Sequence, residues 1–176
     1  MTNILWNMIS CEQGAVAIVV RGDALLRVCF KRSSQDVAAE IKRLHPTAKQ
    51  ASVPLIENWL DQLREYFVGE RQFFSVQFAD VALSDFARKV HLALGEVPFG
   101  QVVTYGELAA KVGSPMAARA VGRVMSSNPF PLFVPCHRVV NADGSIGQYS
   151  SGDGTTTKAW LINFENNCAV KSNSKP

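Results

Sequence analysis

Cys136 and His137 are adjacent in the sequence and could together carry out nucleophilic chemistry. The thiolate is the form of cysteine that attacks carbon, and it needs a base or a nearby positive charge to form at neutral pH. His137 is a candidate base, and Arg138 follows it with a guanidinium group. We therefore expect the pKa of Cys136 to be lowered. The alternative is a small buried cysteine beside a structural histidine, because free cysteines are usually buried and inert.

The segment before this cysteine contains three prolines, Pro129, Pro131 and Pro135. Each proline disfavours helical backbone at the residue that precedes it, so we expect a buried, extended segment that ends at Cys136. Neighbouring side chains on a regular strand point to opposite faces. Cys136 and His137 can therefore cooperate only if the backbone turns between them or a water molecule bridges them. The sequence leaves both possibilities open.

Several sequence blocks around this cysteine resemble the O6-alkylguanine-DNA alkyltransferases, also called methylated-DNA–protein-cysteine methyltransferases. The similarity is strong from about Phe86 to Glu165 and weak before that. The blocks occur in the family's order: Tyr105-Gly106-Glu107-Leu108-Ala109, Ala117-Ala118-Arg119-Ala120-Val121-Gly122, Ser127-Asn128-Pro129 and Pro135-Cys136-His137-Arg138-Val139. A Cys-His pair alone would be a weak signal, whereas these blocks at matching spacing are specific.

The resemblance implies transfer of an alkyl group from DNA to Cys136. In the family pattern His137 deprotonates the thiol through a water molecule, and Glu165 orients His137, as in other nucleophile, base and orienter sets. Tyr105 matches the residue that protonates the leaving guanine. The thioether formed on Cys136 is too stable for water to hydrolyse, so each chain would react only once. The resemblance implies no cofactor.

The same resemblance assigns residues to the damaged base, O6-alkylguanine or O4-methylthymine. Tyr149 and Ser150 would close over the base, with backbone N–H and hydroxyl donors near O6. The backbone carbonyls of Cys136 and Val139 would accept hydrogen bonds from the guanine amine. Asn128 would connect the DNA-binding helices to the active-site strand through hydrogen bonds to the backbone.

Two short helices must position the side chains that bind DNA. Thr104 and Glu107 have the spacing of a capping box, which opens a helix. Ser114-Pro115 is expected to open the second helix, with the proline in its first turn. These elements predict a helix-turn-helix over residues 105–126, followed by an active-site strand and loop over residues 128–152.

The second of these helices carries two arginines on one face. Arg119 and Arg123 are four residues apart, and the residues beside them, Ala117, Ala118 and Gly122, are small enough for another molecule to approach closely. The resemblance implies that Arg119 fills the gap left when a base is flipped out of the duplex. It also implies that this helix enters the minor groove of double-stranded DNA with little sequence preference.

The chain as a whole is expected to have an α+β fold with two domains. Residues 1–80 predict a small α+β domain with a strand hairpin, two helices and a short last strand at Phe73 to Phe78. Residues 84–168 predict a mostly helical alkyltransferase domain, and residues 169–176 a frayed tail.

Charge is unevenly distributed along the chain. The net charge of +3 comes entirely from residues 84–176, which contain nine basic and six acidic side chains. Between Leu108 and Ala142 there are four basic residues and no acidic one. Such a stripe fits a polyanionic partner, although a run this short also arises by chance.

The remaining composition excludes several classes of protein. The four cysteines and three histidines are dispersed, which fits reduced thiols and argues against a metal site. No apolar run has the length of a membrane span, and no secretion signal is evident. We therefore expect a cytoplasmic monomer that does not interact with membranes.

Two departures from the family pattern leave the range of accepted alkyl groups open. Ser151 stands where the family more often has glycine, and the stretch 152–157 is longer than usual; both are expected beside the loop that walls the alkyl pocket. One rival interpretation is a non-catalytic helix-turn-helix sensor or regulator, against which the presence of Cys136 counts. A second is a cysteine hydrolase built on Cys136, His137 and Glu165, for which no oxyanion hole is evident.

Overall fold

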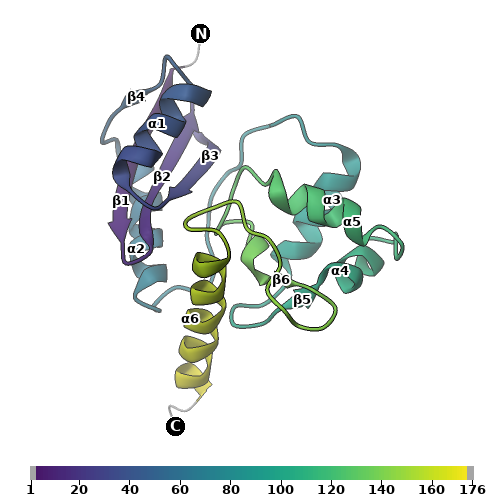
Figure 1. The fold of residues 1–176 in the computed structure, drawn as a ribbon. Coiled ribbons are helices and arrows are strands. Elements are labelled where there is room, and N and C mark those ends of the chain that lie inside the picture. The colour runs from purple at the N-terminus through teal and green to yellow at the C-terminus, as the bar shows by residue number, and fades with distance from the viewer. Residues whose placement is uncertain (1–2, 174–176) are drawn as a thin grey trace. The chain divides into compact units, whose positions relative to one another are not determined.

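A computed structural model describes residues 3–173 of the chain (Figure 1). The chain divides into two compact units. One runs to Val81 and includes Ser151–Asp153; the other comprises Ala82–Ser150 and the chain from Gly154 onward. A sheet with helices forms the first unit and a mostly helical arrangement the second, which confirms the α+β class. Ser151–Asp153 was expected in the second domain, but its backbone bonds to the edge of the first unit's sheet.

The first unit is built on a four-stranded sheet with the order β3-β2-β1-β4. β1 (Ile4–Cys11), β2 (Gly14–Arg21) and β3 (Ala24–Lys31) form an antiparallel meander, and β4 (Lys49–Gln50) runs parallel to β1. The central strand is buried without interruption from Ala15 to Val20. A strand buried on both faces must be covered twice, which explains why its sequence is continuously apolar.

Two helices cover this sheet. α1 (Ser34–Leu44) begins at Ser33, whose side chain accepts a hydrogen bond from the Asp36 backbone N–H, and α2 is Pro54–Phe67. The expectation of a strand from Phe73 to Phe78 is wrong. This segment meets the sheet only at Leu25, where the backbone forms one isolated bridge with Phe78, so no ladder develops along it.

The described part of the second unit contains four α-helices and a two-stranded parallel sheet. Its helices are α3 (Asp85–Gly95), α4 (Tyr105–Lys111), α5 (Ala118–Ser126) and α6 (Thr155–Asn173); its strands are β5 (Val103–Thr104) and β6 (Val139–Val140). The predicted capping box is confirmed, because the Glu107 N–H donates to the Thr104 hydroxyl at 3.1 Å and the Thr104 N–H donates to the Glu107 carboxylate at 2.7 Å.

Two helix boundaries differ from expectation. The second helix of the helix-turn-helix does not open at Ser114-Pro115, because the Ala117 N–H first closes a turn onto the Ser114 carbonyl at 2.8 Å. The helix then starts at Ala118. The tail expected to fray from Ala169 continues α6 as far as Asn173, and residues 174–176 lie outside the described part of the chain.

The segment that leads to Cys136 is buried as expected but is not a strand. Its side chains Phe130, Leu132, Phe133 and Val134 are all buried. The backbone turns here, because the Val134 N–H donates to the Phe130 carbonyl at 2.8 Å and Leu132 has the left-handed φ of 74°. Within residues 3–173, no helix combines the length and the apolar character that crossing a membrane requires.

Candidate active site

A short 3-10 turn, η1 (Cys136–Arg138), places the thiol and the imidazole. The Cys136 N–H donates to the Val134 carbonyl at 2.8 Å, and the Arg138 N–H donates to the Pro135 carbonyl at 2.9 Å. The strand β6 follows immediately and is held by its parallel pairing with β5. The backbone therefore turns at Cys136. The side chains of Cys136 and His137 consequently do not point to opposite faces of a strand, as they would on extended backbone.

His137 and Arg138 share the buried carboxylate of Glu165. The Nε2 atom of His137 lies 2.8 Å from Oε1 of Glu165, and the guanidinium of Arg138 donates to both carboxylate oxygens at 2.8 and 3.0 Å. Arg138 also donates to the Val97 carbonyl at 2.7 Å, and the Gly100 N–H donates to Glu165 at 3.2 Å. All three residues are buried, with exposed fractions of 0% for His137, 6% for Arg138 and 1% for Glu165.

Gly100 is required for this arrangement. Its φ of +77° is in the left-handed region, and a Cβ atom on it would lie 2.7 Å from the Cβ atom of Ala169. Only glycine therefore allows the backbone to approach α6 closely enough for its N–H to reach Glu165.

The protonation states in this cluster follow from burial and charge. Burial alone would raise the pKa of Glu165, but the interactions with His137 and Arg138 hold that pKa well below its ordinary value. Burial lowers the pKa of His137, against the opposing effect of Glu165, so its imidazole is neutral at neutral pH. An ionised carboxylate only accepts hydrogen bonds, so Nε2 carries the proton. The lone pair on Nδ1 is then available to take a proton.

The Nδ1 atom of His137 is buried and has no hydrogen-bond partner among residues 3–173. With Nε2 bonded to Glu165, neither ring nitrogen is hydrogen-bonded to the Cys136 thiol. Glu165 thus orients the His137 imidazole and leaves its Nδ1 atom unpaired. An unpaired Nδ1 is what a proton transfer from the thiol through a water molecule would require.

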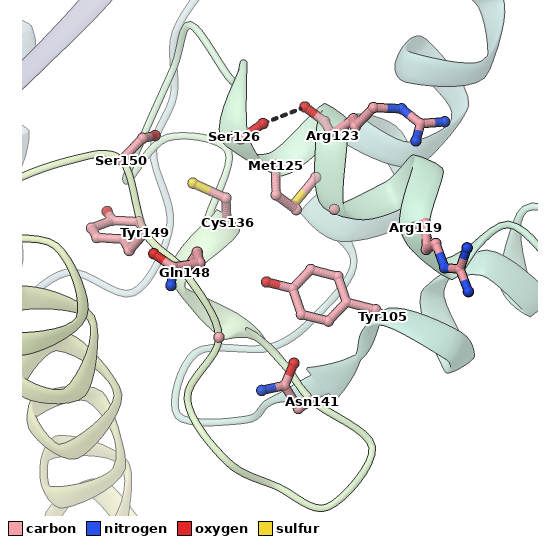
Figure 2. A pocket seen from close by; sticks show the side chains of 12 residues that line it. Tyr105, Arg119, Arg123, Met125, Ser126, Cys136, Asn141, Gln148, Tyr149 and Ser150 are labelled. Atoms are coloured by element: carbon pink, nitrogen blue, oxygen red, sulfur yellow. Dashed lines mark hydrogen bonds between the residues drawn. The ribbon is translucent and has the colours of Figure 1, made fainter.

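Cys136 lines a pocket of about 580 Å³ (Figure 2). In Figure 2 the loop with Tyr149 and Ser150 forms one wall and α5 the other, and Cys136 and Tyr105 lie between them. The complete lining consists of Tyr105, Arg119, Gly122, Arg123, Met125, Ser126, Cys136, Asn141, Gly147, Gln148, Tyr149 and Ser150.

The pocket gathers most of the residues expected at the site. Seven of the expected residues line the pocket: Tyr105, Arg119, Gly122, Arg123, Cys136, Tyr149 and Ser150. His137 and Glu165 are buried outside its lining. Val139 is buried in β6, and Ala117 and Ala118 lie at the start of α5, also outside the lining. The guanidinium groups of Arg119 and Arg123 are exposed and point away from Cys136 in Figure 2.

Asn128 connects the end of α5 to the turn before Cys136. Its amide nitrogen donates to the Val134 carbonyl at 2.8 Å, and its amide oxygen accepts from the Phe130 N–H at 3.0 Å. These are hydrogen bonds of the kind expected for this residue.

Sequence reasoning missed five residues that line the pocket: Met125, Ser126, Asn141, Gly147 and Gln148. Gly147 had a readable signal, because a glycine in a loop can mark a close approach of the backbone. A Cβ atom on Gly147 would lie 2.8 Å from the Tyr105 hydroxyl, so only glycine brings the loop this near. Met125 is both buried and part of the lining.

The expectation that the pKa of Cys136 is lowered is wrong. Burial raises the pKa of this thiol, and the opposing effects of Asn128 and Lys158 are smaller. The side-chain charges on which the expectation was based do not stabilise the thiolate, because Arg138 is paired with Glu165 and the His137 imidazole is neutral. Burial also raises the pKa of Tyr105, and the thiolate form of Cys136 raises it further, which keeps the Tyr105 hydroxyl protonated and able to donate.

The two departures from the family pattern do not line the pocket. The Gly152 N–H donates to the Phe30 carbonyl at 2.8 Å, and Asp153 lies 3.5 Å from the Arg32 guanidinium, so Ser151–Asp153 belongs to the unit that contains β3. No group of three or more His, Cys, Asp or Glu side chains able to hold a metal ion occurs in the part of the chain that the structure describes.

Two comparisons of the sequence with known proteins point to the same family. Residues 85–167 match the family model described as the DNA binding domain of 6-O-methylguanine DNA methyltransferase. The chain is 36% identical over 152 residues to the constitutive methylated-DNA–protein-cysteine methyltransferase of Bacillus subtilis (strain 168), which covers 86% of this chain and 89% of that protein.

A solved structure extends the likeness to the fold. The crystal structure of Mycobacterium tuberculosis OGT in complex with DNA is 32% identical, with a TM-score of 0.79 over 93% of this chain and 94% of that chain. The sequence likeness and the matching fold both cover nearly the whole chain. The chain therefore belongs to the methylated-DNA–protein-cysteine methyltransferase family.

Proposed function

We propose that this protein repairs DNA by transferring the alkyl group of O6-alkylguanine, and of O4-methylthymine, to the sulfur of Cys136, once per chain. The observation that carries the proposal is the position of the thiol. Cys136 opens into a pocket of about 580 Å³, and the residue after it is a buried histidine hydrogen-bonded to a carboxylate. The site thereby combines a nucleophile, a proton acceptor and an orienting group with space for a nucleobase.

The reaction starts with the movement of a proton. The thiol gives its proton through a water molecule to Nδ1 of His137, and Glu165 stabilises the imidazolium that forms. The thiolate then attacks the alkyl carbon, so the S–C bond forms while the C–O6 bond breaks and its electron pair leaves with guanine.

The leaving guanine takes a proton from the Tyr105 hydroxyl. The proton held by His137 returns to Tyr105 through solvent, so the products are neutral guanine and a neutral thioether on Cys136. Burial keeps Tyr105 protonated, which supports its role as the donor. Tyr149 and Ser150 close over the base, and the Val139 carbonyl accepts from its amine.

The thioether ends the reaction. No other cysteine lines the pocket: among the described residues Cys29 lies in the core of the first unit, and Cys11 and Cys168 are half-buried elsewhere. Without a second thiol to resolve the product, each chain accepts a single alkyl group.

The helix α5 is proposed to contact double-stranded DNA through the minor groove. Arg119 and Arg123 are exposed at the pocket, and the small side chains of Ala117, Ala118 and Gly122 allow close approach. The reacting base must leave the stack, and Arg119 fills the space that it vacates. Because the damaged base occurs anywhere in DNA, little sequence preference is expected.

Intact-mass measurement after incubation with duplex DNA that contains O6-methylguanine tests the proposed transfer. We expect one added methyl group per chain, located on the peptide with Cys136. Turnover beyond one equivalent, or methyl groups on another cysteine, would contradict the proposal. DNA binding without any change in mass would instead indicate a non-catalytic sensor.

Replacing Arg119 with alanine tests the base-flipping role. We expect transfer from duplex DNA to slow by at least about tenfold, since unstacking a base costs a few kcal/mol. Transfer from free O6-benzylguanine should be unchanged, because a free base needs no flipping. Lys89→Ala, which removes an exposed positive charge on α3, is the matched control and should leave both rates unchanged. Equal losses on both substrates in Arg119→Ala would show that Arg119 supports the fold or the pocket.

A further inference from the structure

Lys158 on the first turns of α6 is a completely buried lysine, with an exposed fraction of 0%. Its Nζ atom is also buried and has no hydrogen-bond partner among residues 3–173. A buried ammonium without a partner is unfavourable for the folded state, because it loses its hydration and gains no hydrogen bond. A residue that the fold disfavours in this way is a candidate for a role in function.

The surroundings of Lys158 belong to the active site. Its Nζ atom lies 5.7 Å from the centroid of the Tyr105 ring, at the distance of a cation–π contact, and Tyr105 lines the pocket with Cys136. Burial lowers the pKa of Lys158, and the charge of a Cys136 thiolate opposes that shift. Burial raises the pKa of the Cys136 thiol, and the charge of Lys158 opposes that shift in turn.

The other charged and titratable groups near Cys136 are already committed. On η1, His137 is neutral and hydrogen-bonded to Glu165, and Arg138 is paired with the same carboxylate. On α4, Tyr105 is protonated. On α5, the arginines are exposed and point away from the thiol (Figure 2). Among the described residues of this unit, Lys158 is therefore the buried cation that has no carboxylate partner.

We propose that Lys158 is a positioning residue that acts through Cys136, and that its buried ammonium stabilises the thiolate form of the acceptor. It exchanges no proton in the reaction. It lowers the free energy of the anion that remains after the thiol proton has moved to His137. The inference rests on two parts of the proposed function, which are Cys136 as the reacting group and His137 as the group that takes its proton.

The thiolate can be measured without DNA. The rate of Cys136 alkylation by iodoacetamide, followed by mass spectrometry on the peptide with this cysteine, is recorded against pH. Lys158→Met removes the charge and keeps a similar length, Lys158→Arg keeps the charge, and Lys89→Met is the control for an exposed lysine of the same unit.

We expect Lys158→Met to move the midpoint of this profile upward by at least about one pH unit, which is a tenfold loss of thiolate on the acid side. The limiting rate at high pH should be unchanged. Lys158→Arg should retain most of the thiolate, and Lys89→Met should coincide with the unmodified protein. Coinciding profiles for Lys158→Met and the unmodified protein would overturn the proposal.

Thermal unfolding separates this role from a structural one. If the ammonium is disfavoured by the fold, Lys158→Met should melt at the same temperature as the unmodified protein or higher. A variant that melts lower or does not fold would contradict the proposal, since the fold would then need the lysine. If the unmodified protein accepts no alkyl group from DNA, the proposed function fails, yet the iodoacetamide profile still decides the role of Lys158.

Discussion

Cys29 and Cys136 are buried to the same extent, each with an exposed fraction of 4%, but in different regions of the molecule. Cys29 lies on β3 within the apolar core that also contains Val37 and Ile41 of α1. Cys136 lies on a 3-10 turn and lines a pocket. The comparison shows that burial by itself does not decide whether a cysteine can react; access and the neighbouring polar groups do.

The electrostatic surroundings of the two thiols differ in the same way. Burial raises the pKa of both, and that of Cys29 reaches about 11. The charges near Cys29 have both signs and oppose one another, whereas Asn128 and Lys158 both favour the thiolate of Cys136. A nearby base is a further difference, because His137 follows Cys136 directly.

The largest expected effect is on alkyl transfer when each cysteine is replaced by serine. Cys136→Ser should lower the rate by about a thousandfold or more, because a neutral hydroxyl is a far poorer nucleophile. Cys29→Ser should still accept one alkyl group per chain, although a buried hydroxyl without a partner should lower stability by about 1–3 kcal/mol. Intact mass and urea unfolding measure the two effects. Transfer by Cys136→Ser at the normal rate would remove the proposed distinction.

The next effect concerns ion pairs in the two regions. Glu165→Gln leaves Arg138 buried without its counter-ion, so we expect the free energy of unfolding to fall by about 3–5 kcal/mol at pH 7. The matched control is Glu40→Gln in the first unit, where Glu40 pairs with Arg43 at 3.0 Å near the surface. Its loss should lower stability by less than about 1 kcal/mol.

Acid should reduce the difference in stability between Glu165→Gln and the unmodified protein. The pKa of Glu165 in the folded state is below the value of 4.5 for a free side chain, so the unfolded chain takes up a proton first as the pH falls. The stabilisation is therefore complete above about pH 4.5 and decreases below it. Urea unfolding at pH 7 and at pH 4 would show this, and an unchanged difference would argue against an ionised Glu165.

The smallest effect is an alkaline loss of stability caused by Cys29. Its pKa is near 9.0 when unperturbed and about 11 in the folded protein, so between these values the unfolded chain loses the proton and the folded one keeps it. Stability should then fall as the pH rises, by about 2.7 kcal/mol once the pH has passed both values, at about 1.4 kcal/mol per pKa unit. Urea unfolding from pH 8 to 11 should show a shallower loss in Cys29→Val. Parallel curves for the variant and the unmodified protein would mean that Cys29 is not the cause.

The sequence alone determined the features that depend on a few neighbouring residues. The capping box at Thr104 and Glu107 consists of local hydrogen bonds, and the structure contains it. The strand runs of the first unit and the Pro135-Cys136-His137-Arg138 block are equally local, which is why the fold class and the family could be predicted.

The tertiary structure decided what depends on residues far apart in the sequence. Glu165 meets His137 and Arg138 across 28 and 27 residues, and this pairing removes the expected effect of Arg138 on the thiol. Lys158 gave no signal in the sequence, because its burial beside Tyr105 exists only when α6 packs against α4 and η1. The pKa of Cys136 follows from these contacts and from the desolvation that they cause, and no local pattern encodes either.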